Sequence, residues 1–215
     1  GYENKLDDLR ARLEEAQGQR LCSSRKGNKG EAVVLAQLHQ LFPKAEIEDT
    51  HTVAGRGDFI VRDNGLVMMV ETKNYTRNVP KAEVDKFFRD LENAGNEEFQ
   101  CAVLVSQRSG VCCREDFAFE MRGTKPVLFI HKLEENYESL VLAAKFFKLV
   151  LDASEAVDLQ SKSIQDELRA AGSCMLRGFN DQRAAVNRFH STQLDQIAAQ
   201  QARLVQLFGS LGQKL

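Results

Sequence analysis

The 215-residue chain is 43% hydrophobic and carries 29 basic against 31 acidic residues, which gives a formal net charge of -2 at pH 7. This length accommodates one sizeable domain with additional helices, and the charge excludes a uniformly basic nucleic-acid coat. No apolar run approaches the ~20 residues of a membrane span, and the charged N-terminal segment lacks the apolar core of a secretory signal. We therefore expect an intracellular protein, cytoplasmic or nuclear, that does not enter a membrane.

The five cysteines favour reduced thiols over a disulfide framework. They are odd in number, form no CxxC pair, and two of them, Cys112 and Cys113, are adjacent and therefore poorly placed to bridge. The four histidines show no ligand spacing with each other or with the thiols, which argues against a zinc site.

The N-terminal segment, residues 1–21, is expected to form one short helix. Leucines and an alanine recur there at three- and four-residue steps on a charged background: Leu6, Leu9, Leu13 and Ala16. A stripe of this kind packs on a neighbouring element or on a partner chain, because so short a helix is marginal by itself. The segment that follows, RLCSSRKGNKG, contains basic residues and no acid.

Residues 22–152 alternate between helical and strand patterns. The order helix, three strands, helix, strand, helix, strand, helix predicts an α/β fold with a mixed α+β sheet flanked by helices. A helix is expected over 31–42, and a second one opens near Pro80 with an apolar face of Val84, Phe87, Phe88 and Leu91. The predicted strands cover 46–53, 57–63, 66–73, 101–106 and 127–131, and further helices are predicted near 114–121 and over 135–152.

Residues 153–215 show only helical periodicity. Apolar residues form two stripes, the first containing Ile164, Leu168, Ala171 and Met175 and the second containing Ile197, Leu204, Leu207 and Leu211. Gly172, Gly178 and Asn180 predict a break between two helices. Such a region, like residues 1–21, favours coiled-coil contacts and a homo-oligomer.

One predicted hairpin carries the chemistry. Asn64-Gly65 is a strong two-residue turn signal, so Asp63 pairs with Leu66, and counting outwards places Asp58 directly across from Glu71. Two carboxylates at that position repel each other unless a cation neutralises them. Divalent cations that prefer oxygen ligands suit such a pair.

Strand alternation places Lys73 on the same face as Glu71. An ammonium beside a metal site can orient or help to deprotonate an attacking water, and it can offset charge that develops on a phosphate. The side chain of Thr72 points away, but its backbone carbonyl can still reach a metal.

A third acid, Glu31, lies upstream on a predicted helix. It precedes Val34 and Leu35 by three and four residues, which places it on the apolar face of that helix. The alternative is a first-turn glutamate favoured by the helix dipole.

Gly57-Asp58, followed after twelve residues by Glu71-Thr72-Lys73 and preceded by a helix bearing Glu31, resembles the PD-(D/E)xK, or restriction endonuclease-like, nuclease superfamily. The resemblance covers about residues 26–131 and departs from the motif at Gly57, where its proline would stand. It implies that Asp58 and Glu71 bind Mg²⁺, with Mn²⁺ as a substitute, that Lys73 assists the nucleophile, and that Glu31 supports the metal or its waters.

Six further residues are candidates for binding nucleic acid: Arg25, Lys26, Lys29, Arg56, Tyr75 and Lys81. Beside a nuclease centre, the basic side chains would contact phosphates and Tyr75 would stack on a base. Taken alone, a basic loop, a packed tyrosine and a surface lysine are each common without such a role.

The sequence thus predicts a Mg²⁺-dependent nuclease, an endonuclease that hydrolyses the phosphodiester bonds of DNA. Two alternatives stay open. The first is a catalytically inactive nuclease fold that binds nucleic acid without cutting it, and the second is a helical assembly protein whose working surfaces are its terminal helices.

Overall fold

The computed structural model describes residues 30–154 and 158–212. The predicted helix over 1–21 and the basic side chains Arg25, Lys26 and Lys29 lie outside the described residues. The chain divides into two compact units, one ending at Ser173 and the other being Cys174–Leu215. Within the described ranges, no helix combines the length and the apolar character needed to cross a membrane.

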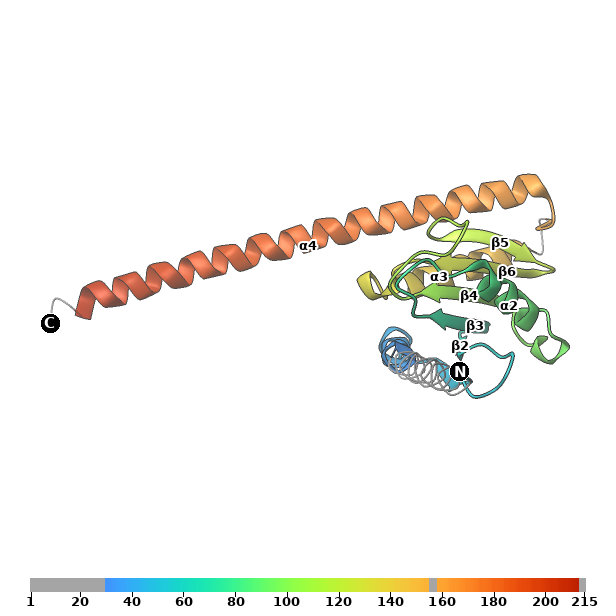
Figure 1. Cartoon of the computed structure of the whole chain (residues 1–215). Helices are drawn as coiled ribbons and strands as arrows, with labels where there is room; N and C mark the ends of the chain where they lie inside the picture. The colour runs from blue at the N-terminus through green and yellow to red at the C-terminus, as the bar shows by residue number, and fades with distance from the viewer. Residues whose placement is uncertain (1–29, 155–157, 213–215) are drawn as a thin grey trace, which may run out of the picture. The chain divides into compact units, whose positions relative to one another are not determined.

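The first unit is built on a six-stranded mixed sheet with the order β1-β2-β3-β4-β6-β5 (Figure 1). Strand β2 pairs antiparallel with both β1 and β3, β4 runs parallel to β3 and to β6, and β5 pairs antiparallel with β6. Their bounds are β1 (Glu46–Asp49), β2 (Phe59–Asp63), β3 (Leu66–Lys73), β4 (Cys101–Ser106), β5 (Ala118–Arg122) and β6 (Lys125–Ile130). The predicted α+β architecture, a mixed sheet with flanking helices, is confirmed.

Residues 30–41 are helical, and three further α-helices follow along the chain. These are α2 (Lys81–Leu91), α3 (Ser139–Ala153) and α4 (Lys162–Gly212), with short 3-10 turns η1 (Ala94–Asn96) and η2 (Leu133–Glu135). Within the helix over 30–41, Val34 and Leu38 are buried, and Phe42 is buried directly after its end, as the spacing predicts. It ends before Pro43, which cannot donate a backbone hydrogen bond.

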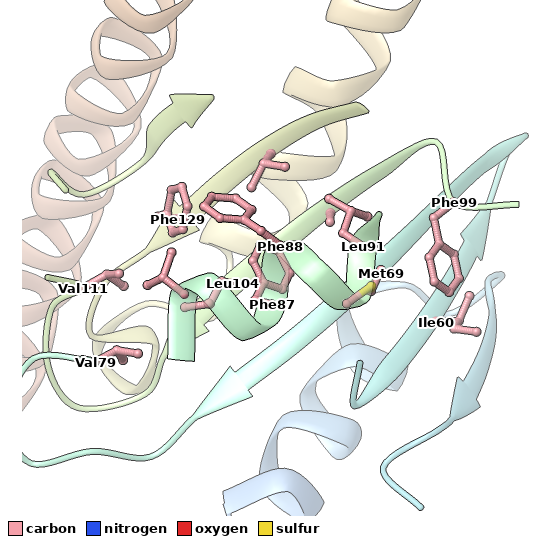
Figure 2. Close-up of a cluster of buried hydrophobic side chains, with 13 residues drawn as sticks. Ile60, Met69, Val79, Phe87, Phe88, Leu91, Phe99, Leu104, Val111 and Phe129 are labelled. Atoms are coloured by element: carbon pink, nitrogen blue, oxygen red, sulfur yellow. The ribbon is translucent and has the colours of Figure 1, made fainter. Parts of the chain in front are cut away.

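The main core lies between the sheet and α2 (Figure 2). The apolar face predicted for α2 is buried, and its Phe87 and Phe88 pack edge-on or nearly so against Phe129 of β6, with ring centroids 6.4 and 6.1 Å apart. Ile60 and Met69 extend the same cluster to β2 and β3. Successive strand residues face opposite sides of a sheet, so the alternate buried residues serve the other face, where α3 contacts β3 and β6.

The helix predicted near 114–121 is wrong, because residues 118–122 form β5. Phe117 has φ +59°, which no right-handed helix tolerates, and Phe119 enters the core. A two-residue turn containing Gly123 at φ +57° joins β5 to β6 and pairs Arg122 with Lys125. Pairing with a neighbouring strand therefore overrides the local pattern.

The break predicted in the C-terminal region is also wrong, because α4 continues through Gly172, Gly178 and Asn180. A glycine inside a helix costs only about 1 kcal/mol relative to alanine, which is insufficient to end a long helix. A Cβ at Gly172 would lie 3.5 Å from the Phe146 ring, an ordinary van der Waals contact, so packing there does not require glycine.

Candidate active site

The candidate site lies at the edge of the sheet where the parallel strands β3 and β4 both end (Figure 1). Lys73, the last residue of β3, is in register with Ser106, the last residue of β4. The backbone N–H of Gln107 then donates to the Lys73 carbonyl at 2.9 Å. The pairing of the two strand ends therefore holds in place the backbone that carries the side chains of the site.

The hairpin register predicted from Asn64-Gly65 is confirmed. Both turn residues have positive φ, +48° and +82°, as a type I′ turn requires. Asp63 pairs with Leu66 and the ladder continues to Phe59. One step further, Asp58 lies level with Glu71, and its N–H donates to the Val70 carbonyl at 3.0 Å.

The Asp58 carboxylate is held by β3. Its Oδ2 accepts a hydrogen bond from the Thr72 backbone N–H at 2.6 Å and another from the Thr72 Oγ1 hydroxyl at 2.8 Å. Both of these hydrogen bonds reach Oδ2. The expectation that the Thr72 side chain points away from the site is therefore wrong, because its hydroxyl reaches Asp58. Asp58 is also close enough to Glu71 for its charge to raise the pKa of that residue.

Glu71 and Lys73 form a buried ion pair at the centre of the site. Glu71 is only 5% exposed, and its Oε1 lies 2.8 Å from the Lys73 Nζ. Burial and the charge of Asp58 raise the pKa of Glu71, and Lys73 opposes them. Burial alone would lower the pKa of Lys73, but Glu71 and Glu83 outweigh it and raise that pKa. Lys73 is therefore an ammonium ion at every physiological pH.

Glu83 is a member of the site that the sequence reasoning missed. It stands in the first turn of α2, and its Oε2 lies 2.9 Å from the Lys73 Nζ, while its Oε1 accepts a hydrogen bond from the Tyr75 hydroxyl at 3.1 Å. The sequence did contain a signal for Glu83. A helix that opens at Pro80, only seven residues after the end of β3, brings the acid in its first turn back to the end of that strand. Local spacing gave no reason to choose Glu83 over other surface acids.

Glu31 approaches the same edge from the helix over 30–41. Burial raises the pKa of Glu31, and the charge of Asp58 adds to that increase, while His51 and Lys73 oppose it. The preceding Gly30 allows this approach, because a Cβ there would lie 2.6 Å from the Gln107 Oε1 and 2.8 Å from the Asn74 Nδ2. A larger residue at that position would require the ends of the Gln107 and Asn74 side chains to move.

The backbone at Gly57 excludes the proline of the nuclease motif that the sequence resembles. Its φ is +71°, whereas proline is restricted to about -65°, so proline cannot occupy this backbone conformation. A Cβ would also meet the Met69 Cγ at 2.9 Å and the Val70 carbonyl oxygen at 3.1 Å. Only glycine fits directly before Asp58 here.

Three of the candidates for binding nucleic acid, Arg56, Tyr75 and Lys81, lie within the described residues, and two of them already have partners within the protein. Arg56 is committed to an ion pair with Glu98 and lies over the Phe99 ring, so its guanidinium has structural partners. Tyr75 is 38% exposed and is tethered to Glu83 through its hydroxyl, and Lys81 is exposed at the first turn of α2.

The donor chemistry of the site suits a divalent cation. Glu71 and Glu83 contact the ammonium of Lys73, and the carboxylates of Asp58 and Glu31 lie close enough to interact electrostatically with this group, which leaves an excess of negative charge. In the geometry described for residues 30–154 and 158–212, no three His, Cys, Asp or Glu side chains converge closely enough to hold a metal ion. Lys73 Nζ lies between Glu71 and Glu83 and contacts both.

Comparisons with protein-family models, with curated proteins and with solved structures found no match to this chain. The site must therefore be interpreted from its own chemistry.

Proposed function

We propose that this chain is a Mg²⁺-dependent nuclease that hydrolyses phosphodiester bonds in DNA. The observation that carries the proposal is the grouping of four acids at the carboxyl end of β3, where Glu71 and Glu83 contact Lys73 and where Asp58 and Glu31 interact electrostatically with the same group. Unbalanced negative charge in a partly buried site is costly, and binding of a divalent cation offsets that cost.

The proposal includes a restriction endonuclease-like core. It would consist of the helix over 30–41, the strands β1 to β3, α2 and β4. The positions of Asp58, Glu71 and Lys73 on the β2–β3 hairpin support this assignment, because they reproduce the Asp…Glu-x-Lys spacing on adjacent antiparallel strands.

The metal would be held by the Oδ1 of Asp58, by Glu71 and by the backbone carbonyl of Thr72, with Glu31 supporting its water ligands. A bound Mg²⁺ supplies a Lewis acid for the scissile phosphate and lowers the pKa of a bound water. The Thr72 hydrogen bonds to Oδ2 would fix the orientation of the Asp58 carboxylate and keep Oδ1 directed away from β3.

Lys73 would act as a fixed positive charge in this mechanism. Because its pKa is raised, Lys73 stays protonated and would not act as a general base. It would instead orient the attacking water and offset negative charge on the phosphate. Glu83 is the positioning residue for this ammonium, since it holds the Nζ from the α2 side while Glu71 holds it from β3.

The test is cleavage of plasmid and single-stranded DNA with Mg²⁺, with Mn²⁺ and with a chelator. Asp58→Asn and Lys73→Ala should each reduce the rate by about 10²-fold or more, the scale of losing one charge-stabilising group. Asp63→Asn is a matched control, because it makes the same substitution at the other end of β2, next to the turn. Cleavage that survives in Asp58→Asn or Lys73→Ala would refute the site.

A second candidate function is DNA binding without cleavage by the same fold. The observation that favours it is the absence, among the described residues, of three converging metal-ligating side chains. In that event the protein would retain DNA under every metal condition and cut none, and Asp58→Asn would leave the binding affinity unchanged.

A further inference from the structure

The loop between β4 and β5 carries two adjacent cysteines, Cys112 and Cys113, whose thiols contact each other. Their Sγ atoms lie 3.3 Å apart, and both side chains reach the surface, Cys113 being exposed and Cys112 half-buried. A disulfide bond is about 2.05 Å long, so the sulfurs would have to approach by only ~1 Å to form one. The proposed nuclease site does not use either thiol.

The two cysteines occupy the central positions of a β-turn. The N–H of Arg114 donates to the carbonyl of Val111 at 3.3 Å, which closes the turn around them. Cys113 has φ +58°, a conformation that glycine or asparagine ordinarily supplies at the third residue of a turn. Cysteine has no advantage in closing such a turn, so the backbone geometry gives no reason for a thiol at this position.

The backbone of this turn is held from two sides. Val79, directly before the start of α2, donates its N–H to the Gly110 carbonyl at 2.9 Å and accepts the Cys112 N–H at 3.0 Å. On the other side, the Val111 N–H donates to the Nε2 of His131, the residue that follows β6, at 3.1 Å. These hydrogen bonds fix the turn against two neighbouring segments, and the two thiols are therefore kept together.

Adjacent cysteines are poorly suited to a structural disulfide but well suited to a reversible one. Successive Cα atoms are about 3.8 Å apart, which is below the range of about 4.4–6.8 Å that disulfides usually span. Strain of this kind makes the bond easier to reduce, and strained or exposed disulfides are the labile ones. A bond between Cys112 and Cys113 would therefore form in the presence of an oxidant and open again in the presence of reduced thiols.

We propose that Cys112 and Cys113 form a redox-active dithiol, which hydrogen peroxide oxidises to a disulfide between the two neighbouring residues and which small thiols reduce. The Cys113 thiolate attacks one peroxide oxygen and the O–O bond breaks, which gives a sulfenic acid and one water. The Cys112 thiol then attacks that sulfur, the S–O bond breaks, the S–S bond forms and a second water leaves. The sulfurs together lose two electrons, the peroxide gains them, and both thiol protons end in water.

The difference between the two thiols supports this order of events. Cys113 is the more exposed of the two, so peroxide reaches it first. A hydrogen bond with Cys113 and the charge of that residue raise the pKa of Cys112, while the charges of Arg114 and Lys81 oppose the increase. Cys112 therefore keeps its proton while Cys113 reacts, and it serves as the resolving thiol.

Peptide mapping of the oxidised full-length chain tests the proposal. Trypsin cleaves after Arg108 and Arg114, so one peptide, residues 109–114, contains both cysteines and no other. After brief treatment with hydrogen peroxide and alkylation of the remaining thiols, this peptide should be unalkylated and lighter by two hydrogen atoms than its reduced form. Incubation with reduced glutathione should then restore two alkylatable thiols. Added oxygen atoms, linkage to another peptide, alkylation of both thiols after peroxide, or resistance to glutathione would overturn the proposal.

Phenylarsine oxide, whose oxygen two thiols displace as water to form two S–As bonds, probes the reduced pair. Cys113→Gly should lose the adduct when it is washed with a monothiol, yet its Tm should equal or exceed that of the wild type, because glycine accepts the positive φ. The matched control is Cys174→Ser, which removes an exposed cysteine that does not adjoin another one and should retain the adduct. Equal retention by both variants, or loss in both, would refute the dithiol. None of these measurements depends on whether the chain cleaves DNA.

Discussion

The Nζ of Lys73 lies 2.8 Å from the Oε1 of Glu71 and 2.9 Å from the Oε2 of Glu83, so one ammonium joins the end of β3 to the start of α2. This bridge organises the site and also contributes to stability. Its two acids differ in environment, because Glu71 is almost wholly buried whereas the Glu83 side chain is 28% exposed. The consequences of removing either partner should therefore differ.

Lys73→Ala should destabilise the fold as well as impair catalysis. The substitution leaves the Glu71 carboxylate buried without its cation, and breaking a buried ion pair in this way costs about 3 kcal/mol. Urea unfolding monitored by circular dichroism measures the loss. Lys81→Ala, which removes an exposed lysine from the first turn of α2, should cost less than about 0.5 kcal/mol. Equal effects of the two substitutions would contradict the bridge.

Glu83 should make stability depend on pH. Burial alone would raise the pKa of Glu83, but hydrogen bonds from Lys73 and Tyr75 outweigh it and hold that pKa below its ordinary value of 4.5. A lowered pKa in the folded state gives stability that is present above pH 4.5 and is lost as the pH falls through the folded-state value. The free energy of unfolding of Glu83→Gln should therefore decline less than that of the wild type between pH 6 and pH 3. Parallel curves would exclude Glu83 from the bridge.

Gly57→Ala should be more damaging than Gly65→Ala. Both glycines have positive φ, so each alanine costs about 1 kcal/mol in backbone strain. Around Gly65 there is open space, whereas a Cβ at Gly57 collides with Met69 and with the Val70 carbonyl. Thermal unfolding should show the larger loss for Gly57→Ala, and DNA cleavage should fall with it because Asp58 is the next residue.

Mg²⁺ should stabilise the folded chain through Asp58 and Glu71. A ligand at 100 times its Kd adds about 2.7 kcal/mol to the free energy of unfolding, which raises the Tm by about 5–10 °C for a chain of this size. Differential scanning fluorimetry with and without Mg²⁺ measures the shift without recourse to activity. Asp58→Asn should abolish it and Asp63→Asn should retain it. An undiminished shift in Asp58→Asn would place the cation elsewhere.

Much of the site followed from local sequence. A two-residue Asn-Gly turn admits essentially one register, and alternation along β3 then determines that Glu71 and Lys73 share a face. The apolar face of α2 could also be predicted from the sequence, because helical spacing alone identifies Val84, Phe87, Phe88 and Leu91. These features depend on residues close together in the chain.

Only the tertiary structure determined which residues from distant segments of the chain contact one another. The sequence could not show that Thr72 would hold the Asp58 carboxylate, that Glu83 would return to Lys73, or that residues 118–122 would pair with β6 as a strand. Each of these outcomes arises because a long-range contact outweighs a local preference of at most about 1 kcal/mol. Local sequence therefore determined which groups stand on each element, and packing between elements determined which of those groups meet.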